Sequence, residues 1–159
     1  MKLMDAMRAK ARANVKKIVF PEGKTWRDYV RDTRLEITCG EAPYIVSRYD
    51  TTTGEAIPLR ERIGLLDRKL RVVSENTTTS GEWLEWAQAA YKSTYGYEWQ
   101  GDNLLIAREA MLISFIEGER LRFNESKDKV ITKELFKLCF AICCCYVEDF
   151  VNWKKTVKN

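Results

Sequence analysis

Residues 34–50, with the sequence Arg-Leu-Glu-Ile-Thr-Cys-Gly-Glu-Ala-Pro-Tyr-Ile-Val-Ser-Arg-Tyr-Asp, decide how the rest of the chain is interpreted. They predict a short strand over Leu35–Thr38, because Leu35 and Ile37 alternate with polar residues. Cys39-Gly40 then predicts a tight turn, where the missing Cβ lets a ligand approach the backbone closely. On spacing alone an ordinary strand-to-helix turn also fits, since a single glycine is not the spaced trio of a dinucleotide-binding fingerprint.

The composition is typical of one globular domain spanning residues 1–159. Hydrophobic residues make up 45% of the chain and charged residues 31%, which argues against disorder. The formal net charge of +4 is mildly basic, so it permits an acidic partner without requiring one. The chain has no histidine, which excludes histidine-based catalysis and most zinc and iron sites. We therefore expect no bound metal.

The cysteines and the longest apolar run bear on the compartment. Five cysteines are an odd number, and Cys143–Cys145 are consecutive, which is a poor framework for disulfides. This predicts a reducing, cytoplasmic location. The run Leu138–Val147 is far shorter than the roughly 20 apolar residues of a membrane span, so we expect a buried helix and no membrane anchor.

Residues 1–33 predict a basic, largely helical N-terminal region. Its basic residues are candidates for contact with a nucleic acid or a partner protein, although a solvated helix face is the favoured explanation. Lys17–Phe20 suggests a short strand, and Thr25 with Asp28 suggests the start of a helix. The candidate contact residues are Arg8, Lys10, Arg12, Lys16 and Lys17.

The remainder of the chain alternates helical and strand-like segments. Helices are expected over 63–73, 82–92, 103–122 and 130–157, the third of them capped by Asp102. Alternating aromatic residues predict a second strand over Tyr95–Trp99. Strands separated by helical stretches favour a helix-rich α/β fold with a small, mostly parallel sheet and a C-terminal helix.

Several stretches together resemble a known protein family. The most specific are the residues 34–44, RLEITCGEAPY, the residues 47–55, SRYDTTTGE, and the residues 95–109, YGYEWQGDNLLIARE. They resemble the internal part of large restriction-modification DNA methyltransferases, which methylate the exocyclic amine of adenine with S-adenosylmethionine. The resemblance spans residues 24–117, within a methyltransferase-like segment assigned to 34–122.

The resemblance implies a partial Rossmann-like methyltransferase half and a set of cofactor-binding residues. The first strand and its loop would pass under the methionine end of the cofactor. Glu98 would accept hydrogen bonds from the two ribose hydroxyls, and Trp99 would pack on the adenine ring. The implied cofactor-binding residues are Glu36, Thr38, Cys39, Gly40, Tyr44, Glu98 and Trp99.

One motif of that family is absent, and its absence bears on activity. The family's catalytic loop contains two adjacent prolines, whereas the three prolines of this chain are isolated from one another. We therefore expect no catalytic residues and favour a non-catalytic binding protein of a phage or mobile element. Such a protein would interfere with a defence nuclease, of CRISPR or restriction type, by occupying the nuclease or its DNA groove.

The alternative is an S-adenosylmethionine-binding domain that needs a partner chain for catalysis. A gene fragment that folds without a function is a third hypothesis.

Overall fold

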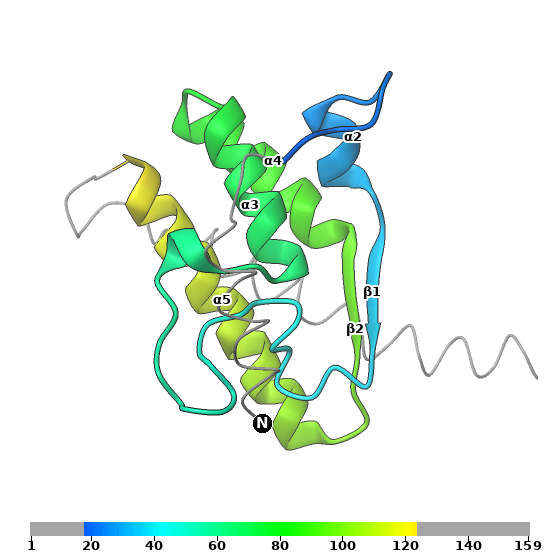
Figure 1. Ribbon diagram of the computed structural model, residues 1–159, viewed down its shortest axis with the longest axis vertical. Coiled ribbons are helices and arrows are strands. Elements are labelled where there is room, and N and C mark those ends of the chain that lie inside the picture. Colours follow the sequence, from blue (N-terminus) through cyan, green and yellow to red (C-terminus); the bar gives the residue numbers. More distant parts are fainter. Residues whose placement is uncertain (1–17, 124–159) are drawn as a thin grey trace, which may run out of the picture.

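The computed structural model describes residues 18–123, and the expected N-terminal helix before them and the expected helix over 130–157 lie outside this range. Within it the chain forms four α-helices, two strands and a short 3-10 helix (Figure 1). In chain order the elements are α2 (Trp26–Arg31), β1 (Arg34–Ile37), η1 (Leu59–Glu61), α3 (Leu65–Asn76), α4 (Ser80–Lys92), β2 (Thr94–Tyr97) and α5 (Gly101–Phe123).

The two strands form a parallel sheet at one side of the molecule (Figure 1). Arg34 lies opposite Thr94, and Ile37 lies opposite Tyr97. The chain crosses from β1 to β2 through η1, α3 and α4, as a parallel connection requires. The expected helix-rich α/β fold with a small parallel sheet is therefore confirmed.

Local sequence signals set the starts of two helices. The Thr25 side chain accepts a hydrogen bond from the Asp28 amide, and the Asp28 carboxylate accepts one from the Thr25 amide, which is a complete capping box. Thr79 caps α4 by accepting a hydrogen bond from the amide of Glu82, without the reciprocal bond of a capping box. The expected cap at Asp102 is wrong, because α5 already begins at Gly101 and Asp102 lies within its first turn.

The core lies between the three longer helices and the inner face of the sheet. Trp83 on α4 is fully buried, its ring packs edge-on against Phe115 of α5 at 5.3 Å, and its Nε1 donates to Ser74 Oγ of α3 at 2.9 Å. Tyr91 packs edge-on against the same Phe115 ring. One indole thus joins three helices, and burying such a side chain contributes about 1.5–3 kcal/mol.

A buried lysine fixes the point at which both strands begin. Lys69 of α3 is fully buried, and its ammonium donates to the carbonyl of Asp32 at 2.6 Å. It also donates to the carbonyl and the hydroxyl of Ser93 at 3.1 and 2.6 Å. Asp32 follows α2 and Ser93 follows α4, so one side chain ties together the helix ends that lead into β1 and β2.

One sequence expectation is wrong at the surface, and one apolar pattern does not correspond to burial there. Ile18–Phe20 form no strand, and Val19 is one of the most exposed apolar side chains among residues 18–123, because the sheet there consists of β1 and β2 alone. Leu105 and Ile106 of α5 fit the apolar pattern of the helix, yet both are exposed. Ala107, the next residue, is buried in the core, so Leu105 and Ile106 are on the part of these turns that does not pack against it.

Candidate functional site

The loop that follows β1 has an unusual backbone. Thr38, Gly40 and Ala42 have φ angles of 57°, 55° and 62°, so three alternate residues lie in the left-handed region. Glycine adopts this conformation readily, but a β-branched threonine does so at a cost of about 1–3 kcal/mol. A Cβ added at Gly40 would meet no atom within 4 Å, so the backbone is open at this point. Backbone strain of this kind is concentrated at binding and catalytic sites.

Glu98 joins this loop to the end of β2. Its Oε2 accepts a hydrogen bond from the Gly40 amide at 2.7 Å, although the two residues are 58 positions apart. Its Oε1 accepts from the amides of Trp99 and Gln100 at 2.8 and 2.9 Å. The bonds from Gln100 and Gly40 lower the pKa of Glu98, so the carboxylate is charged at neutral pH. The structure therefore brings together the two segments that the resemblance had assigned to one site.

A cavity of about 380 Å³ lies beside β1 and the start of α3. Of the expected site residues, Glu36 and Tyr44 line this cavity, whereas Gly40 and Glu98 do not. Glu36 Oε2 is buried and has no hydrogen-bond partner among the described residues. Burial raises the pKa of Glu36 to about 6. The volume falls in the range of about 300–1,000 Å³ that is typical of small-molecule sites.

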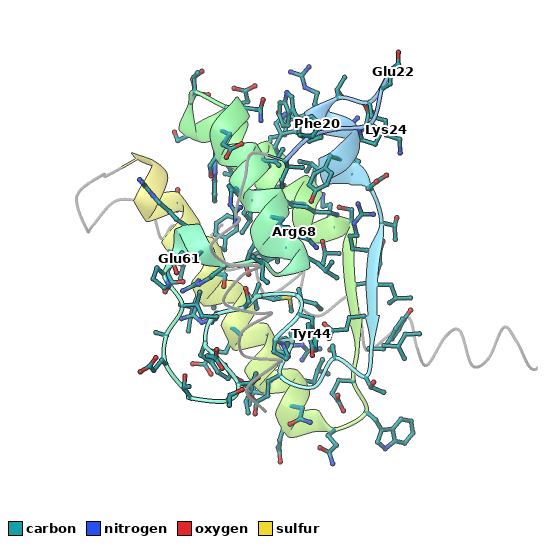
Figure 2. The ribbon with its side chains drawn as sticks, viewed as in Figure 1. Phe20, Glu22, Lys24, Tyr44, Glu61 and Arg68 are labelled. Atoms are coloured by element: carbon teal, nitrogen blue, oxygen red, sulfur yellow. The ribbon has the colours of Figure 1, made fainter. Side chains whose placement is uncertain are left out.

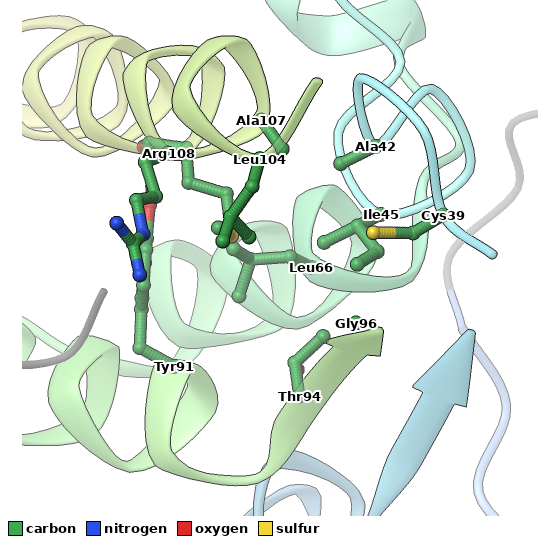
Figure 3. A pocket seen from close by; sticks show the side chains of 11 residues that line it. Cys39, Ala42, Ile45, Leu66, Tyr91, Thr94, Gly96, Leu104, Ala107 and Arg108 are labelled. Atoms are coloured by element: carbon green, nitrogen blue, oxygen red, sulfur yellow. Dashed lines mark hydrogen bonds between the residues drawn. The ribbon is translucent and has the colours of Figure 1, made fainter. Parts of the chain in front are cut away.

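Cys39 has a packing role. Its side chain is buried and lines a second cavity of about 30 Å³ with Gly96 and Arg108, on the inner side of β2 (Figure 3). Burial, with the charges of Glu36 and Glu98 as weaker contributions, raises the pKa of the thiol to about 11. The thiol is therefore protonated at neutral pH and is a poor nucleophile.

The two other expected site residues are exposed. Trp99 follows Glu98 and is 81% exposed, and Thr38 is exposed at the end of β1. Tyr44 is also largely exposed, although it lines the larger cavity (Figure 2). Exposed aromatic rings next to an open backbone can pack on a flat ligand. The structure thus joins Gly40 to Glu98 and places Glu36 and Tyr44 in one cavity, whereas the others lie apart: Cys39 is buried, and Thr38 and Trp99 are exposed outside both cavities.

A polar network that the sequence interpretation missed holds the wall of the larger cavity. The Asp67 carboxylate accepts hydrogen bonds from the Ser47 amide at 2.7 Å, the Ser47 hydroxyl at 3.1 Å and the Gly64 amide at 3.2 Å. The Ser47 hydroxyl in turn accepts from the amides of Ile63 and Gly64. The spacing of Gly64 and Asp67, which matches a helix N-cap and its N3 position, is the signal that could have revealed it.

Two ion pairs attach the segment between β1 and α3 to helix α5. Glu117 of α5 accepts from both terminal nitrogens of Arg48, at 3.0 and 3.3 Å, and from Arg62 at 2.6 Å. The Arg62 side chain is almost fully buried. This attachment keeps the cavity wall in place, since Arg48 and Arg62 flank its lining residues along the chain.

Comparison with known proteins identifies no relative of this chain. No protein-family model matches the chain, and neither the curated proteins nor the solved structures include a match to it. Across residues 18–123, none of the helices combines the length and apolar character that crossing a membrane requires. The expected basic contact residues, from Arg8 to Lys17, lie outside the described residues.

Proposed function

We propose that this chain binds S-adenosylmethionine as the cofactor-binding part of an adenine-specific DNA methyltransferase, with a partner chain supplying the catalytic loop. The hydrogen bond between Gly40 and Glu98 carries the proposal. It joins the two segments that resemble the cofactor-binding segments of that family, at the carboxyl ends of two adjacent parallel strands. Ligands of open α/β sheets bind at this edge.

The residues present fit such a ligand. Gly40 leaves the backbone open for close approach. Glu98 accepts three backbone hydrogen bonds, and a carboxylate offers about four acceptor positions, so one position is left for a ribose hydroxyl. The exposed Trp99 ring is available to pack on adenine. The bound cofactor would supply an activated methyl group, while the orientation of the target amine is left to the partner chain.

Calorimetric titration with S-adenosylmethionine tests the proposal. We expect binding by the wild-type chain and a loss of affinity of about tenfold or more in Glu98→Gln, because one charged acceptor is removed. Arg60→Ala is a matched control, since Arg60 is exposed on η1 and outside both cavities. Absence of binding by the folded wild-type chain would rule the proposal out.

A specific observation also favours a second candidate, the non-catalytic inhibitor of a defence nuclease. The outer face of the sheet is apolar and uncovered among residues 18–123, with Leu35 50% exposed and Ile37 69% exposed. Parallel sheets are normally covered on both faces, so this face is suited to a protein partner. In this second candidate function, a phage or a mobile element encodes the protein.

Cleavage assays distinguish the second candidate from the first. Addition of the protein is expected to stop cleavage by a restriction or CRISPR nuclease, and Ile37→Lys is expected to restore it. Because Ile37 is exposed, this substitution is expected to change the free energy of unfolding by no more than about 0.5 kcal/mol. Cleavage that continues unchanged with every nuclease tested would eliminate the inhibitor function.

A further inference from the structure

The open edge of β1 is complementary to itself. We propose that two copies of this chain pair through this edge, with the two β1 strands antiparallel and Leu35 at the two-fold axis. Each Arg34 then lies opposite Glu36 of the second copy. The product is a continuous four-stranded sheet, with two strands from each copy. This pairing does not require a bound cofactor and is independent of the proposed function.

The backbone of β1 is bonded on one side only. The Arg34 amide donates to the Ser93 carbonyl at 2.9 Å, at the start of the parallel ladder with β2. Because backbone groups alternate along a strand, Arg34 and Glu36 direct theirs towards β2, whereas Leu35 directs its amide and carbonyl towards the opposite edge. In the described part of the chain the sheet has no third strand to cover this edge (Figure 1). Such an edge is a template for another strand.

The inner face of β1 carries opposite charges two positions apart. Arg34 and Glu36 both lie on this face, and Leu35 lies between them on the outer face. When the strand pairs antiparallel with a copy of itself about Leu35, position 34 of each copy faces position 36 of the other. The two Leu35 residues exchange both backbone hydrogen bonds, and the flanking pairs are non-hydrogen-bonded ones, with Cα atoms about 4.5 Å apart. A single inward charge would protect the edge, whereas this spacing forms two ion pairs at once.

The second copy supplies the donor that Glu36 lacks. Glu36 Oε2 is buried and has no hydrogen-bond partner among residues 18–123. A buried acceptor that stays unpaired is costly, so native proteins usually provide it with a donor. The Arg34 side chain is 34% exposed, and its two terminal nitrogens make only long bonds, of 3.3 Å to Asp32 and 3.4 Å to the Thr33 carbonyl. A guanidinium has five N–H donors, so others remain for a carboxylate.

The outer face of the strand adds apolar contact to the same interface. Leu35 is 50% exposed and Ile37 is 69% exposed. The two Leu35 side chains meet at the two-fold axis, and their contact removes apolar surface from water. The interface is isologous, because the same strand contributes the same residues on both sides, so it closes at two copies and does not extend into a fibre.

Sedimentation velocity of the full chain over a concentration series tests the pairing. We expect the wild-type chain to approach the mass of two copies as its concentration rises. Arg34→Glu and Glu36→Arg are each expected to weaken dimerisation about tenfold or more, because like charges then face each other. An equimolar mixture of these two variants is expected to form a heterodimer, since positions 34 and 36 of the two chains again carry opposite charges. Arg60→Glu is the matched control, because Arg60 is exposed on η1, and it should dimerise like the wild-type chain.

Leu35→Pro tests the backbone part of the pairing. It removes the amide that points to the open edge and leaves the bonds to β2, and an edge strand tolerates proline. We expect a monomer with the circular dichroism of the wild-type chain; if this variant does not fold, the mixture of charge variants decides alone. A wild-type chain that stays monomeric at every concentration would overturn the pairing. A dimer that survives both charge variants, or a mixture that forms no heterodimer, would show that Arg34 does not face Glu36 and would refute the proposed register.

Discussion

At the scale of single residues, Glu98 determines the state of the loop after β1. Its pKa is lowered from 4.5, chiefly by the amides of Gln100 and Gly40. A carboxylate with a lowered pKa contributes stability above its unfolded-state pKa and loses that contribution as the pH falls through its folded-state pKa. We therefore expect the hydrogen bond to Gly40 to persist at neutral pH and to break only below pH 4.5.

The amide resonance of Gly40 reports this bond directly. In an NMR titration from neutral to acidic pH, we expect its shift to move with a midpoint below 4.5, the unperturbed value for Glu98. Glu98→Gln is the matched control. The glutamine side chain does not titrate, so this substitution should abolish the transition. A wild-type midpoint at or above 4.5 would contradict the bond in solution.

The sequence could predict some of these residues and not others. Gly40 was found as a glycine in the turn after a predicted strand, and Glu98 was found through the resemblance to the methyltransferase family. Lys69 could not be found, since it lies within the charged run from Asp67 to Arg71, which reads as the exposed side of a helix. Its burial depends on the carbonyl groups of Asp32 and Ser93, each at least 24 positions away along the chain.

At the scale of elements, Lys69 is expected to stabilise the joint between the helices and the sheet. Lys69→Met keeps most of the side-chain length but removes the donor to the Asp32 carbonyl and to the hydroxyl of Ser93, whose carbonyl keeps its bond from the Arg34 amide. We expect a loss of about 2–4 kcal/mol in the free energy of unfolding, measured by urea denaturation. Lys92→Met is the matched control, because Lys92 is exposed, and equal stability of the two variants would refute the role.

The pH dependence of Lys69 has a defined sign. Burial lowers its pKa from 10.5 to about 8. Between these two values the unfolded chain binds more protons than the folded chain at this site, so the contribution of Lys69 to stability rises with pH. Subtracting the pH profile of Lys69→Met from that of the wild-type chain isolates this rise. A difference that stays flat or falls over the same interval would show that burial does not lower the pKa of Lys69.

At the scale of the whole molecule, the spacing of apolar residues predicted where the helices and strands lie better than it predicted which of their faces are covered. The capping box at Thr25 and the parallel pairing of β1 with β2 follow from local signals and are observed. Leu35 and Ile37 were expected to lie in a strand because they alternate with polar residues. This alternation does not show which segment covers each face of the sheet. Their exposure is a tertiary property, because it depends on which segments or partners reach the sheet.

Trp83 tests whether the three longer helices unfold as one unit. It contacts Phe115 of α5 and Ser74 of α3 from its fully buried place on α4, so Trp83→Ala removes contacts in all three helices. We expect a loss of about 3–5 kcal/mol, a large part of the roughly 5–15 kcal/mol of a typical domain. Trp99→Ala, at an 81% exposed position, should cost less than about 1 kcal/mol.

Unfolding of these variants by urea should be followed by circular dichroism and by tryptophan fluorescence together. If Trp83 joins one cooperative core, both signals will shift to the same lower midpoint in Trp83→Ala. Separate midpoints would show that the sheet with its site loop unfolds independently of the helices. Gly40 and Glu98 would then be held by a unit of their own, since the bond between them closes the loop onto β2 and involves no core side chain.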